Sequence, residues 1–164
     1  MTTATHIPTK LMLNQGALSS TLGVNFGDTG TAHFKCGIVV AGTGIPNTTY
    51  PGLTTIADLT GANAEMSYAG YARQALAGIT WAVDGTVDTQ IDWSFSSITF
   101  PEETADPGTG RYGFIAYLGP SGSYADAAAP VVAVLDFGQT VSTANASLTL
   151  APPAGGLIQF TGGG

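Results

Sequence analysis

Residues 31–41 (TAHFKCGIVVA) form the stretch that decides the fold class of this chain. Every second position in it is apolar: Ala32, Phe34, Cys36, Ile38 and Val40. The intervening positions include His33 and Lys35, and alternation with a period of two is typical of a half-buried β-strand. The turn-forming residues 42–47 (GTGIPN) follow, so the strand is expected to end there.

Further short apolar segments, separated by clusters of Gly, Pro, Asp and Asn, occur at 53–58, 79–83, 88–100, 111–118, 131–137, 146–151 and 156–161. Roughly eight or nine short strands at such spacing predict an all-β fold, an antiparallel β-sandwich of jelly-roll-like type. No repeat or linker divides the chain. We therefore expect an extended N-terminal arm and lead-in over residues 1–30 and one sandwich domain over residues 31–164.

Three segments carry local ambiguity. Trp93 and Phe95 share one strand parity while Ile98 and Phe100 share the other, which predicts a β-bulge near residues 96–97. The segment 131–135 (VVAVL) is apolar on both parities. It is either a central strand covered on both faces or a strand whose outer face meets another subunit.

Helix competes with strand over residues 62–77. Ala64, Glu65 and Met66 are good helix formers. Glycines interrupt the segment, however, and Tyr68 and Tyr71 favour strands. Periodicity does not decide between the two.

Charge excludes several classes of function. The chain has four basic and eleven acidic residues, and 9% of it is charged, against roughly 25% in ordinary domains. A net charge of −7 provides no basic surface for nucleic acid. The single cysteine excludes a disulfide framework and a multi-cysteine zinc site.

Hydropathy points to a protein that assembles. No apolar run reaches the ~18 residues of a membrane span, and the N-terminal residues lack the features of a signal peptide. With 44% hydrophobic residues and little charge, the sequence predicts apolar surface at a subunit interface. The alternative is a monomer whose surface consists mostly of Thr, Ser and Gly.

Three motifs follow one another in the middle of the chain. In residues 65–74 (EMSYAGYARQ), five residues separate Glu65 from a Tyr-Ala-Arg-Gln element; residues 98–101 read ITFP, and residues 111–114 read RYGF. This ordered set resembles a pattern of small virion structural proteins of tailed bacteriophages. A Gly/Ser turn at 119–123 and a closing strand pair, here 146–150 and 157–160, extend the resemblance over roughly residues 53–161.

The chain departs from that pattern at one place. An acidic insertion, residues 102–110, precedes the aromatic–Gly pair, where the group usually has Trp or a similar residue. The resemblance implies a β-sandwich virion component, similar to capsid decoration or minor tail proteins, and favours strand over helix at 65–73. It does not separate head from tail.

The expected function is therefore that of a non-enzymatic decoration protein, without cofactor, on the outer capsid surface of the virion and made in the host cytoplasm. Its expected partners are the major capsid protein and copies of itself, as a homotrimer, and not nucleic acid or membrane. The alternative is a minor tail or appendage module that binds a receptor or glycan by stacking Trp81, Tyr50 or Tyr124 on sugar rings.

The nominated contact residues come from two places. Residues 1 to about 16 form the predicted arm, and Arg73 is one of four basic residues, sharing a strand face with Tyr71. Its guanidinium is expected to meet an acidic group at a subunit contact or, alternatively, in a local ion pair. The residues nominated for subunit or capsid contact are Thr5, His6, Ile7, Pro8, Tyr71 and Arg73.

Patterns suggestive of other chemistry have simpler explanations. Residues 108–113 match G-x-G-x-x-G, but a β-like run follows where dinucleotide binding requires a helix. His33 and Cys36 would lie on opposite faces of a strand, which favours a surface histidine and a core cysteine over a metal pair. We therefore expect no catalytic or metal-ligating residues from either pattern.

Two acidic groups were considered as cation ligands. Asp84, Asp88 and Asp92 do not follow the calcium-loop pattern, and Asp84-Gly85 is typical of a hairpin turn. A predicted loop contains Glu102, Glu103 and Asp106. We expect this loop to be solvated and without an ion; the alternative is that it binds a structural calcium ion between subunits.

Overall fold

The computed structural model describes residues 4–6, 23–30, 32–40, 53–85, 90–104 and 108–161. In this part of the chain the strands pair antiparallel, and helical structure is limited to two short 3-10 turns. The predicted all-β, antiparallel sandwich is thereby confirmed.

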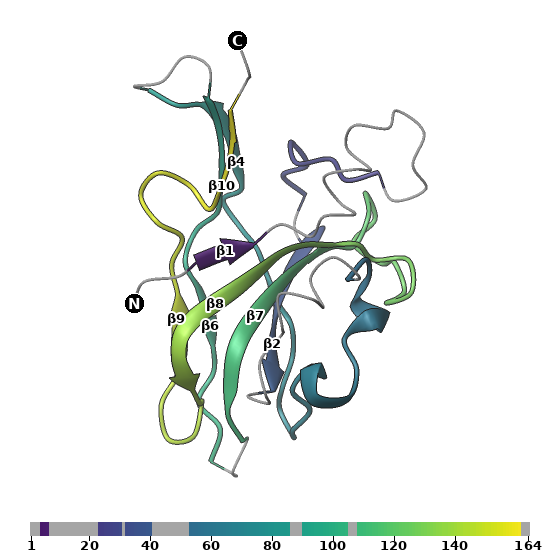
Figure 1. Ribbon diagram of the computed structural model, residues 1–164, viewed down its shortest axis with the longest axis vertical. Coiled ribbons are helices and arrows are strands. Elements are labelled where there is room, and N and C mark those ends of the chain that lie inside the picture. Colours follow the sequence, from purple (N-terminus) through teal and green to yellow (C-terminus); the bar gives the residue numbers. More distant parts are fainter. Residues whose placement is uncertain are drawn as a thin grey trace.

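The strands form three sheets, shown in Figure 1. The largest has the order β1 (Ala4–His6), β8 (Val131–Val141), β7 (Gly110–Tyr117), β2 (Phe34–Val40) and β3 (Gln74–Ala75). A second has the order β10 (Ile158–Thr161), β5 (Gln90–Ser94) and β4 (Thr80–Val83). The third pairs β6 (Ile98–Phe100) with β9 (Leu148–Leu150).

The main core lies between the large sheet and the two smaller sheets. Its centre is aromatic: the Phe34 ring of β2 lies 5.2 Å from Trp93 of β5 and 4.8 Å from Tyr117 of β7, centroid to centroid. All three side chains are buried, and the Trp93 indole N–H donates to the carbonyl of Phe26. This cluster joins the two layers of the sandwich.

A second core covers the outer face of the large sheet. The 3-10 turns η2 (Ile56–Asp58) and η3 (Gly61–Asn63) lie beside that sheet in Figure 1. The buried residues of this cluster are Val39, Leu53, Ile56, Leu59, Tyr112, Phe114, Ala116, Leu118, Ala129, Val131 and Val134. The central strands are therefore covered by their own chain on both faces.

That double cover revises one strand prediction and resolves another. The strand predicted at 31–41 is β2, but Val39 is buried on the side expected to be polar, so the strand is not half-buried. Residues 131–135 are buried throughout, which makes β8 a strand covered on both faces. The β7–β8 register shifts between Ile115 and Ala116, where Val131 and Ala133 are successive partners. A bulge there lets Val132 and Ala133 both join the main core.

The bulge predicted near residues 96–97 is a change of sheet instead. β5 ends at Ser94 and pairs with β4 and β10, whereas β6 begins at Ile98 and pairs with β9. Phe95 and Ile98 are both buried despite their opposite parity. The break between the strands, not an inserted residue, turns both apolar sets inward.

Other local predictions also need correction. Residues 53–58 are not a strand: Asp58 accepts hydrogen bonds from the backbone N–H groups of Thr54 and Thr55 at 2.8 Å and closes turn η2. The two closing strands do not pair with each other, because β9 pairs with β6 and β10 with β5. Residues 65–73 form no helix, and the strand expected there is reduced to a bridge between Glu65 and Val39.

The region predicted as arm and lead-in takes part in the domain. β1 pairs with β8, Thr5 lying opposite Leu135. Val24 and Phe26 are buried in the main core. The described residues before position 31 are therefore part of the sandwich and do not form a separate arm.

The aromatic centre predicts a large loss of stability on truncation. Phe34→Ala should lower the free energy of unfolding by about 3–5 kcal/mol, because it leaves a cavity against Trp93 and Tyr117. Val83→Ala, at a position 61% exposed, should change it by less than about 0.5 kcal/mol. Urea unfolding of both variants measures the difference, and equal losses would contradict this description of the core.

Candidate functional site

The nominated residue Arg73 lies in a cluster of charged groups of its own chain. Its Nε is 2.9 Å from each carboxylate oxygen of Glu65, and its Nη2 donates to Glu65 Oε2 at 2.6 Å. On the other side, Nη1 and Nη2 donate to Asp126 at 2.6 and 2.8 Å. Such bidentate geometry is specific to a planar guanidinium. Of the two alternatives for Arg73, the local ion pair is the one present.

Tyr71 joins the same cluster, although it lies outside a strand. Its hydroxyl donates to Glu65 Oε1 at 2.8 Å and accepts from the backbone N–H of Ile38 at 2.9 Å. Gly37 provides the room: a Cβ there would come within 2.8 Å of Glu65 Oε1. The cluster thus fixes the segment 65–73 to the middle of β2.

The three motifs of the sequence pattern meet at this cluster. The Tyr71 ring stacks on Phe100 at 6.4 Å with an interplanar angle of 8°. The Arg73 guanidinium lies 5.8 Å from the ring centroid of Phe114, a cation–π contact. We call Glu65, Tyr71, Arg73, Phe100, Phe114 and Asp126 the motif cluster.

Electrostatics in the motif cluster favour fixed charges over proton transfer. Burial and the nearby Glu65 carboxylate raise the pKa of Tyr71 above its usual range. Hydrogen bonds to Asp126 and Glu65 raise the pKa of Arg73, and the same guanidinium lowers the pKa of Asp126. The groups therefore hold their charge states near neutral pH, which suits a structural clamp.

The other nominated residues lie at the N-terminal strand. Thr5 and His6 belong to β1 and are paired with Leu135 and Val134 of β8. Ile7 and Pro8 lie outside the described residues. The structure therefore does not bring the arm residues together with Tyr71 and Arg73 in a described contact.

A second polar cluster was missed by the sequence analysis. Asp28 accepts from the backbone N–H of Gly30 at 3.0 Å, bonds His33 Nδ1 at 2.7 Å and accepts from the Tyr117 hydroxyl at 2.9 Å. Burial and the bond to Asp28 raise the pKa of Tyr117 to about 12. The residues are 89 positions apart at most, so only the fold brings them together.

Exposed apolar side chains concentrate on β4. Val83 is 61% exposed and Trp81 is 39% exposed. Both lie on the side of their strand that carries the pairing with the buried Trp93, which is the side of the sheet that faces the main core. The Trp81 ring stacks on Phe26 at 5.7 Å and 15°. Among the described strands β4 is one of the two outer strands of its sheet, and Figure 1 places it at the top of the molecule. We call Trp81 and Val83 the β4 face.

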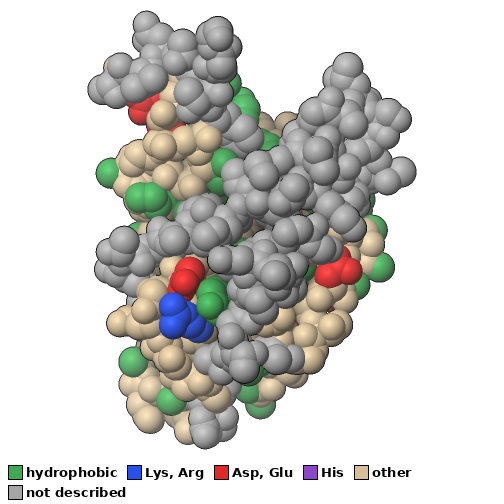
Figure 2. Space-filling model, viewed as in Figure 1, with side chains coloured by type: hydrophobic (Ala, Val, Ile, Leu, Met, Phe, Trp, Pro, Cys, Tyr) green, Lys and Arg blue, Asp and Glu red, His purple; other side chains and the backbone are tan. Residues whose placement is uncertain are grey.

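Charge is sparse on the surface as well. On the face drawn in Figure 2, the described atoms are mostly uncharged, and the acidic and basic side chains form small separate spots. Val40 and Tyr124, each 40% exposed, are the other large exposed apolar side chains of the described residues, while Tyr50 lies outside them.

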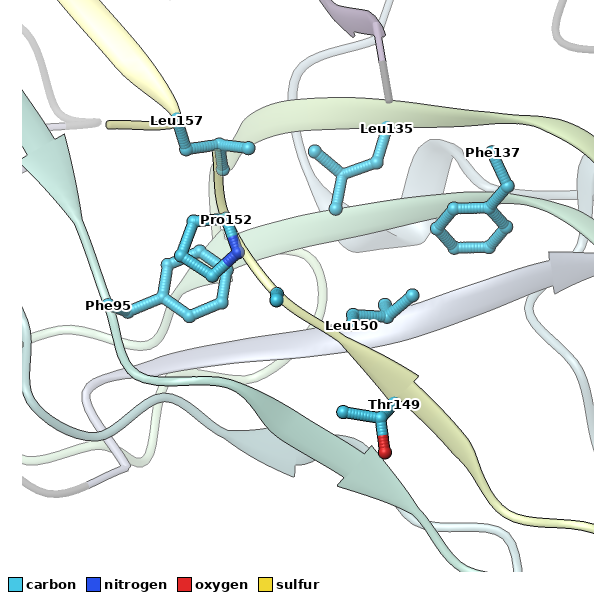
Figure 3. Close-up of a pocket in the computed structure, with 8 residues that line it drawn as sticks. Phe95, Leu135, Phe137, Thr149, Leu150, Pro152 and Leu157 are labelled. Atoms are coloured by element: carbon cyan, nitrogen blue, oxygen red, sulfur yellow. The ribbon is translucent and has the colours of Figure 1, made fainter. Parts of the chain in front are cut away.

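A cavity of about 180 Å³ lies between the layers beside β8. Leu135 and Phe137 point into it from β8, opposite Leu150 of β9 and close to Phe95 and other apolar residues, as Figure 3 shows. Its lining side chains carry no titratable group. Such a cavity accepts an apolar side chain but offers no chemistry for catalysis.

The patterns considered for other chemistry have structural roles. Residues 110–113 begin strand β7, so no helix follows the glycine-rich stretch. Cys36 is buried, and burial raises the pKa of its thiol, so it is the expected core residue. Asp84 follows β4, which pairs antiparallel with β5, and residues 86–89 of the predicted turn region lie outside the described residues.

The acidic residues show no cation site in the part of the chain that is described. No group of three or more His, Cys, Asp and Glu side chains there is arranged to hold a metal ion. Glu103 Oε1 accepts from the backbone N–H of Thr104, while Asp88 and Asp106 lie outside the described residues.

Comparisons with known proteins return no match: no protein-family model, curated protein or solved structure is significantly similar to this chain. Within the described residues, no helix is long and apolar enough to cross a membrane.

The motif cluster predicts that Arg73 is needed for stability. Arg73→Met should lower the free energy of unfolding by about 1–3 kcal/mol, because it leaves the part-buried Glu65 carboxylate without its charged donors. Arg111→Met, which removes the more exposed pair with Asp136, is the matched control and should shift the urea midpoint less. A larger shift for the control would contradict the assigned role.

The same cluster predicts a pH dependence. Because Arg73 lowers the pKa of Asp126 from its usual value of 3.8, the pair contributes stability above that value and loses it as the pH falls through the lower folded value. Asp126→Asn should therefore be less stable than the wild type above about pH 5, and the difference should shrink as the pH falls below 3.8 and through the lowered pKa of Asp126. Urea unfolding across this range measures the difference, and a constant gap would refute the linkage.

Proposed function

We propose that this chain is a non-enzymatic structural protein of a tailed-bacteriophage virion, a decoration protein that binds the outer surface of the capsid and stabilises the head. Its partners in this proposal are the major capsid protein and two further copies of itself. The β4 face makes the capsid contact, by apolar burial and not by charge pairing.

The observation that carries the proposal is the open apolar face of β4 on a chain with only four basic and eleven acidic residues. Val83, at 61% exposed, is unusual for a β-branched apolar residue with a neighbouring strand. An outer strand with apolar side chains is a ready site for partner contact, by side-chain burial and by strand addition.

The motif cluster adds support from the sequence pattern. In the first motif, Glu65 holds Tyr71 and Arg73 by hydrogen bonds; Tyr71 contacts Phe100 of the second motif and Arg73 contacts Phe114 of the third. Because these contacts join the three motifs within one fold, their order and spacing in the sequence follow from the fold. The resemblance to small virion proteins is therefore proposed as a likeness of fold.

A second candidate function is favoured by Trp81. Its indole is 39% exposed and stacks on Phe26. An exposed, rigidly held indole suits stacking on a sugar ring, which a receptor- or glycan-binding appendage module requires. The buried Trp93 takes no part in such a site.

Self-association is tested first, on the purified protein. Light scattering with and without EDTA should give the mass of a trimer in both conditions, because the proposed contacts are apolar and backbone contacts without a cation. A monomer at all concentrations would remove the self-association part of the proposal.

Capsid binding is tested by co-sedimentation with heads of the same phage produced without this gene. Val83→Asp should weaken binding by about tenfold or more, because it places a charge on the proposed contact. Thr80→Asp adds the same charge to the opposite face of β4 and should bind like the wild type. Wild-type protein that fails to sediment with heads would refute the capsid role.

The two candidate functions differ in their response to Trp81→Ala and to sugars. A glycan module should show quenching or a shift of tryptophan fluorescence on titration with host cell-wall sugars, lost in Trp81→Ala. We expect no such response, and a saturable one would favour the appendage function.

A further inference from the structure

The short strand β1 occupies an edge that the rest of the molecule leaves open. In the described part of the chain, β8 pairs with β7 along one side, and β1 covers its other side at residues 134–136 only. Val134 and Leu135 are buried there, one in each of the two cores. Without β1, this apolar strand would be the outer strand of the large sheet.

We infer that β1 is exchanged between copies, so that Ala4–His6 of one chain pairs with residues 134–136 of β8 in a neighbouring chain. The inference rests on the self-association in the proposed function and names the contact responsible for it. The exchanged strand makes the same backbone pairs that it makes within one chain.

The chain is long enough for the exchange. Residues 7–22 lie between β1 and the next described segment, and this number of residues can span up to about 50 Å. A second copy is therefore within reach. A contact in which each copy gives its strand to the next is heterologous and can close into a ring, as a trimer requires.

The weakness of the pairing within one chain favours the exchange. Three paired residues give few hydrogen bonds to set against the entropy lost when the segment is ordered. In a closed ring, several such pairings act together and add the surface buried between copies. The chain, with its low charge, has apolar surface to bury in this way.

The cavity beside β8 lies next to the same edge. Leu135 and Phe137 line it, and Leu135 is the register partner of Thr5. Figure 3 shows both side chains pointing into this apolar space. A backbone edge with an adjacent apolar pocket is the arrangement by which added strands are bound.

The experiment is disulfide trapping between two different chains. Ala4→Cys and Asp136→Cys place one cysteine each at positions that are Cα partners in the β1–β8 register. The two variants are co-expressed, oxidised and mapped by mass spectrometry for a 4–136 disulfide that joins two chains. Cys36 is buried and does not compete. Thr140→Cys, exposed on the same strand but four residues out of register, is the matched control.

Both outcomes are informative. A 4–136 disulfide between chains, absent with the control, is the expected result. The double variant Ala4→Cys/Asp136→Cys decides the alternative: if its 4–136 disulfide forms within single chains alone, the exchange does not occur and the inference is wrong.

A second pair of variants tests the exchange without introduced cysteines, in case a cysteine variant does not fold. Thr5→Pro removes a backbone donor in β1, whereas Thr5→Val keeps it. Light scattering should give a fall to about one third of the wild-type mass for Thr5→Pro alone, with both variants still folded by circular dichroism. An unchanged mass for Thr5→Pro would overturn the inference. No capsid is present in these measurements. The strand exchange can therefore prove wrong while capsid binding is still seen by co-sedimentation, and capsid binding can prove wrong while the exchange is observed.

Discussion

The guanidinium of Arg73, held between the carboxylates of Glu65 and Asp126, is the interaction on which the cover of the large sheet depends. Glu65 bridges to β2, Asp126 belongs to the loop between β7 and β8, and Arg73 leads into β3. One cation thus joins the segment 65–73 to a loop residue 53 positions further along the chain. Because the guanidinium lies over Phe114 and the Glu65 carboxylate is part-buried, solvent screens that pair less than an ordinary surface pair, whereas the Asp126 side chain is 50% exposed and its pair is screened more.

The second constraint is that the central strands are buried on both faces. A sheet of this kind needs two covers, and the chain supplies them in alternation: β4, β5, β6, β9 and β10 on one side, and the turns η2 and η3 with the β7–β8 loop on the other. The motif cluster fixes the second cover, and the aromatic centre around Trp93 fixes the first. This division explains why a chain with few charges has two separate hydrophobic clusters.

Much of the fold could be predicted from the sequence, because the alternation of apolar and polar residues indicates where strands lie and which of their side chains are buried. Six strands, β2, β4, β5, β6, β9 and β10, fall within predicted segments, and β7 and β8 overlap theirs but extend beyond them. Two predictions failed for reasons that alternation does not report. Local hydrogen bonds to the Asp58 side chain close a 3-10 turn where a strand was predicted at 53–58, and the break after Phe95 sends one apolar run into two sheets. The partners of Arg73 could not be predicted either, because Asp126 lies 53 residues away and has no local signal.

The residues that stabilise the fold are different from the surfaces proposed to bind a partner. The residues of the sequence pattern are turned inward, where their hydrogen bonds and ring contacts are already satisfied within the chain. The surfaces that we propose for partners lie elsewhere, on the β4 face and along the edge of β8 beside its cavity. Backbone edges and apolar side chains need no charge to bind, which is consistent with a surface that carries so little. Two proteins sharing the inward pattern would therefore share a fold, while their partners would be set by these two open edges.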